Sequence, residues 1–334
     1  MLKNTLYIFA LLLILTSCFK EDDPLPAFPM QTTTIAMGKY YLYQYYFNLV
    51  SNEEVKQDVK NDYDLGFECG DSSWHVVLNT AAFMFAGNTG KKDLIEVSDT
   101  TGLDWRFDKS DGDLDSTAIG QWLTFTGNDT IYSNQVYVLN RGYDHLGKVR
   151  GLRKIKFTKV DSVSYLFEYS DMNDDNYNIF TVQKQEGVTY TYFSFDEGGM
   201  QVEMEPLTDT WDLLFTQYTT LLYTNDGLPY PYLVTGVLSN YGNLQMAVDS
   251  SLTYENIDLG FAKTKTYSIA KDFIGYDWKD VQGDVNTGNV YYEIVEGRTY
   301  LIRNREGLYF KLRFINFYSD EGEKGYPTFQ YDVL

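Results

Sequence analysis

The sequence has few histidines, few cysteines and few prolines. Its 334 residues include 2 His, 2 Cys and 7 Pro. It also lacks the motifs GxSxG, GxGxxG and HExxH and the phosphate-binding loop GxxxxGK[ST]. Two histidines supply little material for acid–base or nucleophilic chemistry near neutral pH. We therefore expect a protein that is not an enzyme, and the shortage of proline argues against long disordered segments.

Positive charge is also scarce. Lys and Arg number 27 against 47 Asp and Glu, so the formal net charge is -20. So acidic a chain is repelled by the phosphates of nucleic acids and by anionic lipid headgroups. The most basic stretch, residues 148–159, alternates charged with apolar residues, which is typical of a strand with one face in water. We expect no nucleic-acid partner.

Aromatic residues, in contrast, are abundant, with 30 Tyr and 21 Phe. Both residue types favour half-buried pleated surfaces. Residues 188–205 alternate on both sides of a DEGG turn, and residues 299–314 alternate around a second turn. No long window has the period of an amphipathic helix. These patterns predict an all-β protein made of antiparallel strands.

The first 18 residues, MLKNTLYIFALLLILTSC, have the features of an export signal. One Lys precedes an apolar run over residues 6–15, which is too short to span a bilayer but suits a secretory signal. The closing LTSC resembles a bacterial lipobox, which implies cleavage before Cys18 and attachment of lipid to its sulfur. The alternative is an ordinary signal peptide with an incidental cysteine. We expect residues 1–17 to be a signal peptide and residues 18–33 to be a lipid anchor and acidic linker.

Four charged residues, Lys20, Glu21, Asp22 and Asp23, follow the cysteine. They resemble the export signal of some surface lipoproteins of Gram-negative bacteria, although a solvated linker would have the same composition. Several acyl chains on one cysteine anchor a protein stably, because each buried CH₂ contributes about 0.8 kcal/mol. We expect a protein anchored by lipid in the outer membrane and exposed at the cell surface.

Two long parts of the chain match one another block by block. The blocks keep one order, and their offset changes in small steps, as short loop insertions would produce. The matched pairs are Tyr46 with Tyr192, Tyr63 with Trp211, Gly90 with Gly242, Gly120 with Gly275, Tyr137 with Tyr300, Lys154 with Lys311, and Phe167 with Phe329. We predict two tandem domains of about 150 residues each, 34–178 and 179–334.

Four segments of the chain resemble the HmuY family of haem-binding surface lipoproteins. They are IAMGKYYLYQYYFNL (residues 35–49), WDLLFTQY (211–218), TYLIRNREGLYFKLRF (299–314) and YPTFQYDVL (326–334). The resemblance implies an all-β domain with the shape of a hand that holds haem between two fingers. It also implies cooperation with a TonB-dependent outer-membrane transporter. Family members have one such domain, so the duplication is a departure.

The haem ligands are a second departure. The best-known members of the family hold iron with two His, whereas His75 and His145 do not match those positions and the second ligand falls near Asn286. Asn is not a haem ligand, but thioethers and phenolates are. For each candidate, a purely structural role is the competing interpretation, since Met often fills gaps in cores. The candidate ligands are Met246, His75, Met84 and Tyr276, with Tyr254 and Tyr267 as further phenols.

Acidic loops suggest a different ligand. Asp111, Asp113 and Asp115 stand at alternate positions in DKSDGDLDST, and oxygen ligands at such a spacing favour Ca²⁺. Asp and Asn also form turns for reasons unrelated to metals. We state Ca²⁺ at these three residues as an expectation beside the alternative of a solvated loop.

These observations lead to two functional interpretations. The first is a surface-anchored, tandem-repeat lipoprotein that captures haem or a related hydrophobic cofactor and delivers it to a TonB-dependent receptor. The second is an accessory subunit of an outer-membrane complex, which keeps the fold but has lost the iron ligands.

Overall fold

The computed structural model describes residues 29–127, 129–284 and 289–334. They form antiparallel strands joined by turns and very short helices, which confirms the predicted all-β class. Within these ranges, no helix is long and apolar enough to cross a membrane. The predicted signal peptide, Cys18 and the charged residues 20–23 lie outside the described residues.

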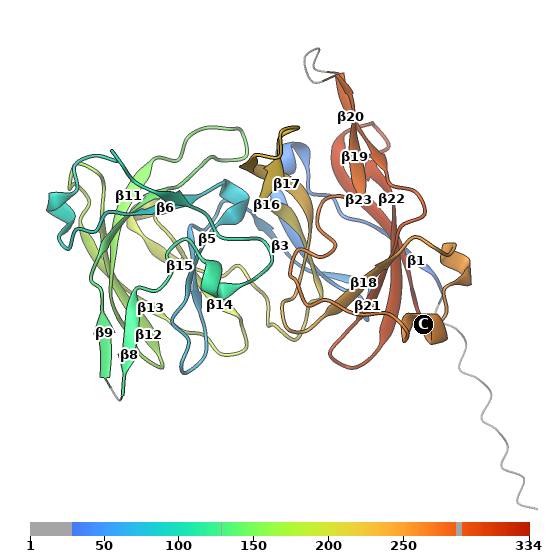
Figure 1. Ribbon diagram of the computed structural model, residues 1–334, viewed down its shortest axis with the longest axis horizontal. Helices are drawn as coiled ribbons and strands as arrows, with labels where there is room; N and C mark the ends of the chain where they lie inside the picture. The colour runs from blue at the N-terminus through green and yellow to red at the C-terminus, as the bar shows by residue number, and fades with distance from the viewer. Residues whose placement is uncertain (1–28, 128, 285–288) are drawn as a thin grey trace, which may run out of the picture.

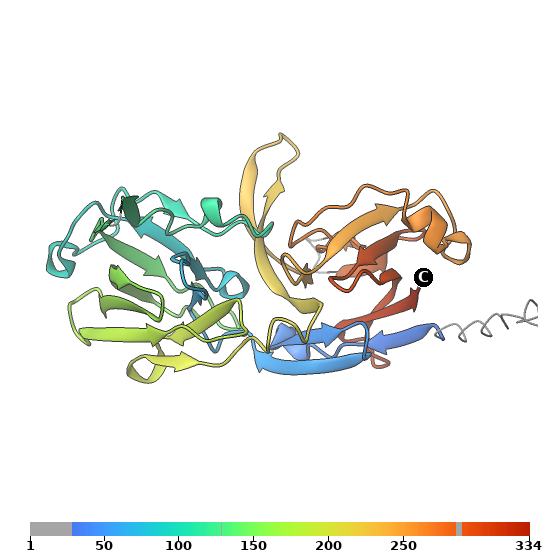
Figure 2. The ribbon, with the colours of Figure 1, turned by 90° about the horizontal axis from the view of Figure 1, so that it is seen from below.

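The strands build two lobes that lie side by side (Figures 1 and 2). The middle lobe comes from the middle of the chain. It contains a six-stranded sheet in the order β13-β12-β11-β10-β6-β7, a four-stranded sheet in the order β15-β14-β4-β5, and the hairpin β8-β9. Its strands are β4 (Leu65–Glu68), β5 (Val76–Leu78), β6 (Phe85–Asn88), β7 (Trp105–Arg106), β8 (Leu123–Thr126), β9 (Asp129–Tyr132), β10 (Val136–Asn140), β11 (Leu152–Val160), β12 (Ser164–Ser170), β13 (Asn178–Gln183), β14 (Tyr190–Ser194) and β15 (Met200–Val202).

The terminal lobe combines the two ends of the described chain. Its sheets have the orders β1-β23-β22-β21-β18 and β17-β16-β2-β3, with the hairpin β19-β20. Its strands are β1 (Gln31–Thr34), β2 (Tyr43–Asn48), β3 (Glu53–Val59), β16 (Leu213–Tyr223), β17 (Pro229–Ser239), β18 (Gln245–Asp249), β19 (Lys279–Asp284), β20 (Asn289–Ile294), β21 (Thr299–Arg303), β22 (Tyr309–Tyr318) and β23 (Lys324–Val333). The short helices of both lobes are η2 (Lys39–Tyr41), η3 (Thr80–Ala82), η4 (Leu94–Glu96), η5 (Leu114–Ser116), η6 (Asp196–Gly198), η7 (Tyr254–Asn256) and α2 (Leu259–Ala262).

The lobes do not follow the predicted division between residues 178 and 179. Strand β2 pairs with β16, with Phe47 opposite Leu213, and β14 pairs with β4, with Phe193 opposite Leu65. Likewise, β1 pairs with β23 and β13 pairs with β12. Each half of the chain therefore gives its first three strands to the lobe that the other half completes. The sequence could not show this exchange, because the two hairpins have the same alternation of residues and either one suits either sheet.

The same trio of aromatic rings lies in the core of both lobes. In the terminal lobe, Phe215 stacks on Phe329 at 5.3 Å, and Phe47 meets Phe329 edge to face at 5.3 Å. In the middle lobe, the rings are Phe67, Phe167 and Phe193, with centroid distances of 5.3 and 5.1 Å. All six are fully buried. In each trio, one ring comes from one half of the chain and two from the other, so each core requires both halves.

A buried lysine occupies an equivalent position in each lobe. Lys311 Nζ donates to the carbonyl oxygens of Tyr254 and Ile257 at 2.9 and 3.1 Å. Lys154 Nζ donates to the carbonyl oxygens of Leu94 and Val97 at the same two distances, and it also contacts Asp174. Such bonds offset the cost of placing an ammonium group in the interior. The predicted match of these two lysines therefore holds at the level of individual contacts.

Other matched residues divide into correct and incorrect pairs. Trp122 and Trp278 are both buried, and each comes directly before a strand, β8 and β19 respectively. The glycines before them, Gly120 and Gly275, have φ of 62° and 63°, in the left-handed region that favours glycine. The match of Gly90 with Gly242 is wrong, because the first follows β6 whereas the second precedes β18.

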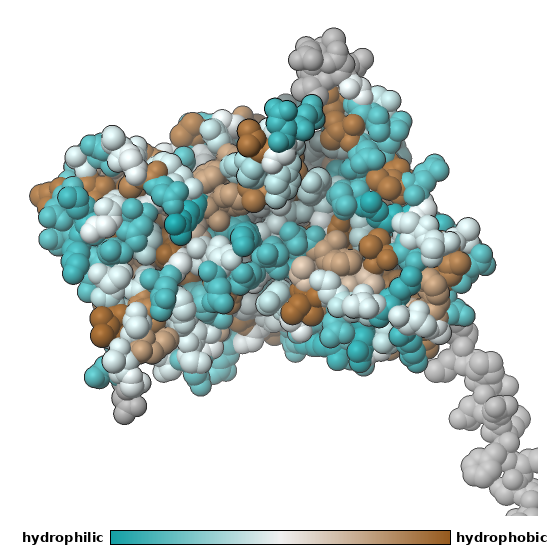
Figure 3. Space-filling model, in the orientation of Figure 1, coloured by the Kyte–Doolittle hydropathy of each residue, from teal (hydrophilic) through white to brown (hydrophobic). Residues whose placement is uncertain are grey.

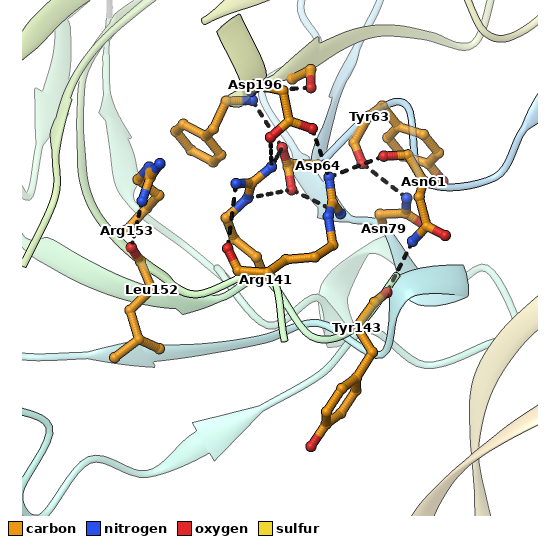
Figure 4. A network of polar contacts seen from close by, with 12 residues as sticks. Asn61, Tyr63, Asp64, Asn79, Arg141, Tyr143, Leu152, Arg153 and Asp196 are labelled. Atoms are coloured by element: carbon orange, nitrogen blue, oxygen red, sulfur yellow. Dashed lines mark hydrogen bonds and ion pairs between the residues drawn. The ribbon is translucent and has the colours of Figure 1, made fainter. Parts of the chain in front are cut away.

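In each lobe, an aspartate accepts a hydrogen bond from the backbone of the hairpin that the other half of the chain contributes. In the middle lobe, Asp64 accepts a hydrogen bond from the amide of Phe195 at 2.8 Å and is held by Arg141 at 2.9 Å and Arg150 at 3.1 Å (Figure 4). In the terminal lobe, the equivalent Asp212 accepts a hydrogen bond from the amide of Leu49 at 2.7 Å. Among the described residues no arginine forms an ion pair with Asp212, and burial raises the pKa of Asp212 to about 6.

This difference between the lobes predicts unequal effects of the same substitution. Asp64→Asn leaves the buried Arg141 with only the exposed Asp196 as a charged partner, so we expect a loss of about 3 kcal/mol in the free energy of unfolding. Asp212→Asn keeps an acceptor for the amide of Leu49 and should cost about 1 kcal/mol or less. Urea unfolding of both variants measures the two values. Equal losses would contradict the assigned role of the arginines.

Candidate functional site

Among the described residues, two long projecting hairpins belong to the terminal lobe alone. Strands β16 and β17 have 11 residues each, whereas the equivalent β4 and β5 have 4 and 3. Strands β19 and β20 have 6 residues each, against 4 each in β8 and β9. The hairpin β19-β20 projects at the top of Figure 1, and β16-β17 projects between the lobes in Figure 2. The two lobes therefore differ in the elements that could hold a ligand.

Exposed apolar side chains do not by themselves mark a site. On the face shown in Figure 3, brown groups are scattered over both lobes and do not gather in one large area. Scattered apolar residues are normal on protein surfaces. What distinguishes the two hairpins is tyrosine: Tyr223, Tyr230, Tyr232 and Tyr291 are all exposed on them.

A group of tyrosines lies on and next to the two hairpins. We call it the finger patch, and it consists of Tyr41, Tyr230, Tyr232, Tyr276, Tyr292 and Tyr318. The ring centroids of Tyr230 and Tyr232 lie 6.2 Å apart on one face of β17. The amide of Tyr292 donates to the hydroxyl of Tyr318 at 2.6 Å.

Three phenols of the finger patch, those of Tyr41, Tyr276 and Tyr292, have a raised pKa and stay protonated at neutral pH. Burial is the main cause that raises the pKa of Tyr41, and the nearby Tyr292 and Tyr318 raise it further. Burial also raises the pKa of Tyr276 and of Tyr292, with Tyr230 and Tyr232 among the respective neighbouring causes. The patch therefore offers flat ring faces and neutral hydroxyl groups.

One buried lysine lies beneath the patch. Lys279 Nζ donates to the carbonyl oxygen of Thr235 on β17 at 2.6 Å and to that of Tyr276 at 3.3 Å. It also lies 4.2 Å from the ring centroid of Trp278 and 5.6 Å from that of Tyr292. The lysine thus links both hairpins. The sequence patterns did not predict a role for Lys279. The only signal for it is its place directly after the matched Trp278.

The structure does not bring the predicted haem ligands together. Met246 is fully buried in β18 within the core of the terminal lobe, and Met84 is buried in the core of the middle lobe. His75 lies in the middle lobe, where its ring stacks on Trp74 at 3.9 Å and its Nδ1 lies 2.6 Å from a carboxylate oxygen of Glu68. Of the four candidates, Tyr276 alone belongs to the finger patch.

The two further phenols, Tyr254 and Tyr267, are hydrogen-bonded to backbone carbonyl groups. Tyr254 is buried, and its hydroxyl donates to the carbonyl oxygen of Lys311 at 3.1 Å. The hydroxyl of Tyr267 donates to the carbonyl oxygen of Ala262 at 3.0 Å. Asn286 lies outside the described residues.

The expectation of Ca²⁺ is not supported. Asp111 and Asp113 accept hydrogen bonds from the amides of Asp113 and Asp115, at 3.0 and 3.1 Å, and Asp113 also accepts one from the hydroxyl of Ser116. The carboxylates thus stabilise their own turns. In the part of the chain that the structure describes, no group of three or more His, Cys, Asp or Glu could hold a metal ion.

The donor set of the hairpins does not fit axial coordination of haem iron by His or Met. Neither β16-β17 nor β19-β20 contains His, Met or Cys anywhere along its sequence, turns included. Tyr41, Tyr276 and Tyr292 keep their protons, because burial raises the pKa of each. A flat ligand held by ring faces and hydroxyl groups fits this surface better than one held by an iron–ligand bond.

Fold and site together define a two-lobed, all-β protein with a tyrosine-lined surface suited to binding. The sequence profile described as "HmuY protein" matches residues 40–331. The chain belongs to the HmuY family, as its resemblance predicted.

Solved structures similar to this chain include apo PinO from Porphyromonas gingivitis. It has 10% sequence identity and a TM-score of 0.29, over 92% of this chain and 98% of that chain. Another is the apo HmuY analog of Tannerella forsythia, with 12% identity and a TM-score of 0.20 over the same shares of the two chains. Likenesses with such low TM-scores carry no further conclusion. No curated protein matches the chain.

The buried lysine generates a prediction on pH dependence. Burial lowers the pKa of Lys279 to about 7, whereas a lysine in the unfolded chain has a pKa of about 10.4. Between these values the unfolded state binds more protons, so the free energy of unfolding rises with pH, and below about pH 7 the full cost of the buried charge remains. Lys279→Leu introduces the residue type found at the equivalent position of the middle lobe, Leu123. It removes this dependence of stability on pH.

We therefore expect the stability of the wild-type protein relative to Lys279→Leu to increase by about 2 to 4 kcal/mol from pH 7 to pH 10. Urea unfolding at pH 6, 8 and 10 measures this difference. Lys263→Leu, at an exposed position, is the control and should show no such trend. A difference between wild type and Lys279→Leu that stays constant over this range would refute the assigned pKa.

Proposed function

We propose that this protein is a surface lipoprotein that captures haem or a related planar, apolar ligand at the finger patch of its terminal lobe. The ligand would lie against the tyrosine rings and accept hydrogen bonds from their hydroxyl groups. The observation that carries this proposal is the finger patch itself, because six tyrosines from five segments of one lobe lie on or next to the two projecting hairpins.

Ring stacking can account for useful affinity without an iron–ligand bond. Aromatic pairs contribute about 0.5–1.5 kcal/mol each beyond the burial of area, and sites for flat ligands combine apolar and aromatic walls with a few polar groups. The exposed Tyr230 and Tyr232 are available for such contacts. The described part of the middle lobe has no hairpins of this length, so we assign the activity to the terminal lobe alone.

The cellular setting of the proposal comes from the leader sequence and the family. Lipid on Cys18 would anchor the protein in the outer membrane, and residues 20–23 would direct it to the cell surface. A TonB-dependent transporter would receive the captured ligand. The acidic chain, with its net charge of -20, would not associate with nucleic acids.

Titration with hemin and with iron-free protoporphyrin IX tests the proposal. Because no His or Met from the hairpins reaches the iron, we expect both compounds to bind saturably, with dissociation constants within about threefold of each other. Absorbance at the Soret band and quenching of tyrosine and tryptophan fluorescence follow the two titrations. Tight binding of hemin together with no binding of protoporphyrin IX would show that iron coordination dominates, against the proposal.

Substitutions at the patch locate the site. Tyr230→Ala combined with Tyr232→Ala should weaken both ligands at least tenfold, since about 1.4 kcal/mol of lost stacking corresponds to that factor. Tyr177→Ala, an exposed tyrosine of the middle lobe, is the matched control and should leave both affinities unchanged. If neither porphyrin binds the wild-type protein, the second interpretation, an accessory subunit of an outer-membrane complex, replaces this one.

A further inference from the structure

A cavity lies where the two lobes meet. Its volume is about 250 Å³, and it is separate from the finger patch. Its walls include Tyr46 on β2 and Tyr192 on β14, which belong to the two exchanged hairpins, and Lys271, which precedes the matched Gly275. Neither lobe could form this cavity alone.

Two side chains of the lining carry hydrogen-bond donors that lack acceptors among the described residues. The indole nitrogen of Trp211 is buried without a hydrogen-bond partner among the described residues. The ammonium group of Lys271 has neither a hydrogen bond nor an ion pair to any residue that the structure describes; its backbone amide, in contrast, donates to the carbonyl oxygen of Asp111 at 2.8 Å. A buried polar group without a partner destabilises the protein unless water or a ligand satisfies it.

The two buried carboxylates of the cavity are already engaged elsewhere. Glu205 accepts hydrogen bonds from the hydroxyl of Thr189 at 2.9 Å and from the amide of Tyr190 at 3.1 Å. Asp108 accepts from the amides of Leu78 and Ala118 at 2.6 and 2.7 Å. Asp108 thus binds backbone amides, and Glu205 also accepts from the hydroxyl groups of Thr189, Thr208 and Tyr192. Neither carboxylate accepts a hydrogen bond from the ammonium group of Lys271 or from the indole nitrogen of Trp211.

The charge of the site limits what could enter it. Burial lowers the pKa of Lys271, while Glu205, Asp108 and Asp272 act in the opposite direction. An anionic oxygen beside the ammonium group would satisfy it and favour its charged form. Because these three carboxylates act on Lys271, and Glu68 and Asp113 also line the cavity, a ligand with one negative charge is favoured over one with two or more.

The remaining walls are aromatic and apolar. Tyr46 meets Trp211 edge to face at 4.9 Å, and Tyr63 meets Tyr192 in the same way at 4.8 Å. Leu214 completes this part of the lining. A cavity of about 150 Å³ is enough for benzene, so the larger volume here suits an aromatic ring with a short polar substituent.

We propose that this cavity binds a small aromatic monocarboxylate, with the ring against Tyr46 and Trp211 and the carboxylate on the ammonium group of Lys271. The junction between the lobes is thus a second binding site, distinct in place and in ligand chemistry from the finger patch. The proposal does not depend on porphyrin binding.

Matched acids and amides test this assignment on the purified protein. The probes are benzoate, phenylacetate and indole-3-acetate, each compared with its neutral amide by isothermal titration calorimetry at pH 7.5. We expect at least one acid to bind saturably and at least tenfold more tightly than its amide. Absence of saturable binding by all three acids, or equal affinity of each acid and its amide, would overturn the proposal.

Two variants locate the binding. Lys271→Met should weaken the acid at least tenfold and leave the amide unchanged, whereas Lys263→Met should change neither. Binding that survives Lys271→Met but is lost in the Tyr230→Ala, Tyr232→Ala double variant would place the acid on the finger patch and contradict the assignment. Circular dichroism checks the folding of each variant, and if Lys271→Met fails to fold, the comparison of acid with amide on the unaltered protein decides.

Discussion

The contact of Phe47 with the stacked pair Phe215 and Phe329 is the interaction on which the rest of the structure depends. The first ring comes from the beginning of the chain and the other two from its second half, and Phe193 makes the reciprocal contact in the middle lobe. Burying one such side chain contributes about 1.5–3 kcal/mol. Because each core is incomplete without the rings of the other half, each lobe folds only with strands from both halves of the chain.

The exchange of strands also explains why the two lobes meet at a fixed junction. The crossing segments are fixed by Asp64 in one lobe and by Asp212 in the other, through the amides of the arriving strands. These contacts bring tyrosines of both exchanged hairpins to the same cavity. Meanwhile the lobes have diverged at their hairpins: Leu123 begins the short β8, while Lys279 begins the longer β19 beneath the finger patch. One lobe has thus kept the elements suited to holding a flat ligand.

Much of this architecture could be predicted from residue patterns. The alternation of apolar residues indicated strands, and the matched Lys154 and Lys311 proved equivalent in their contacts. The partner of each hairpin could not be predicted, because both hairpins suit both sheets. The ligand candidates were chosen by position along the chain, and Met246 lay on the buried face of its strand. The finger patch and Lys271 depend on contacts between distant segments, which no local pattern encodes.

The most direct test of the account is cleavage at the exposed turn between β12 and β13. A site for a specific protease inserted between Asp175 and Asn176, which are both exposed, would divide the chain where the two halves meet. After cleavage in native buffer, the account predicts that the fragments elute together from gel filtration at the size of the intact protein and separate only in denaturant. Two fragments that elute separately, each folded, would contradict the exchange of strands and the cavity that depends on it.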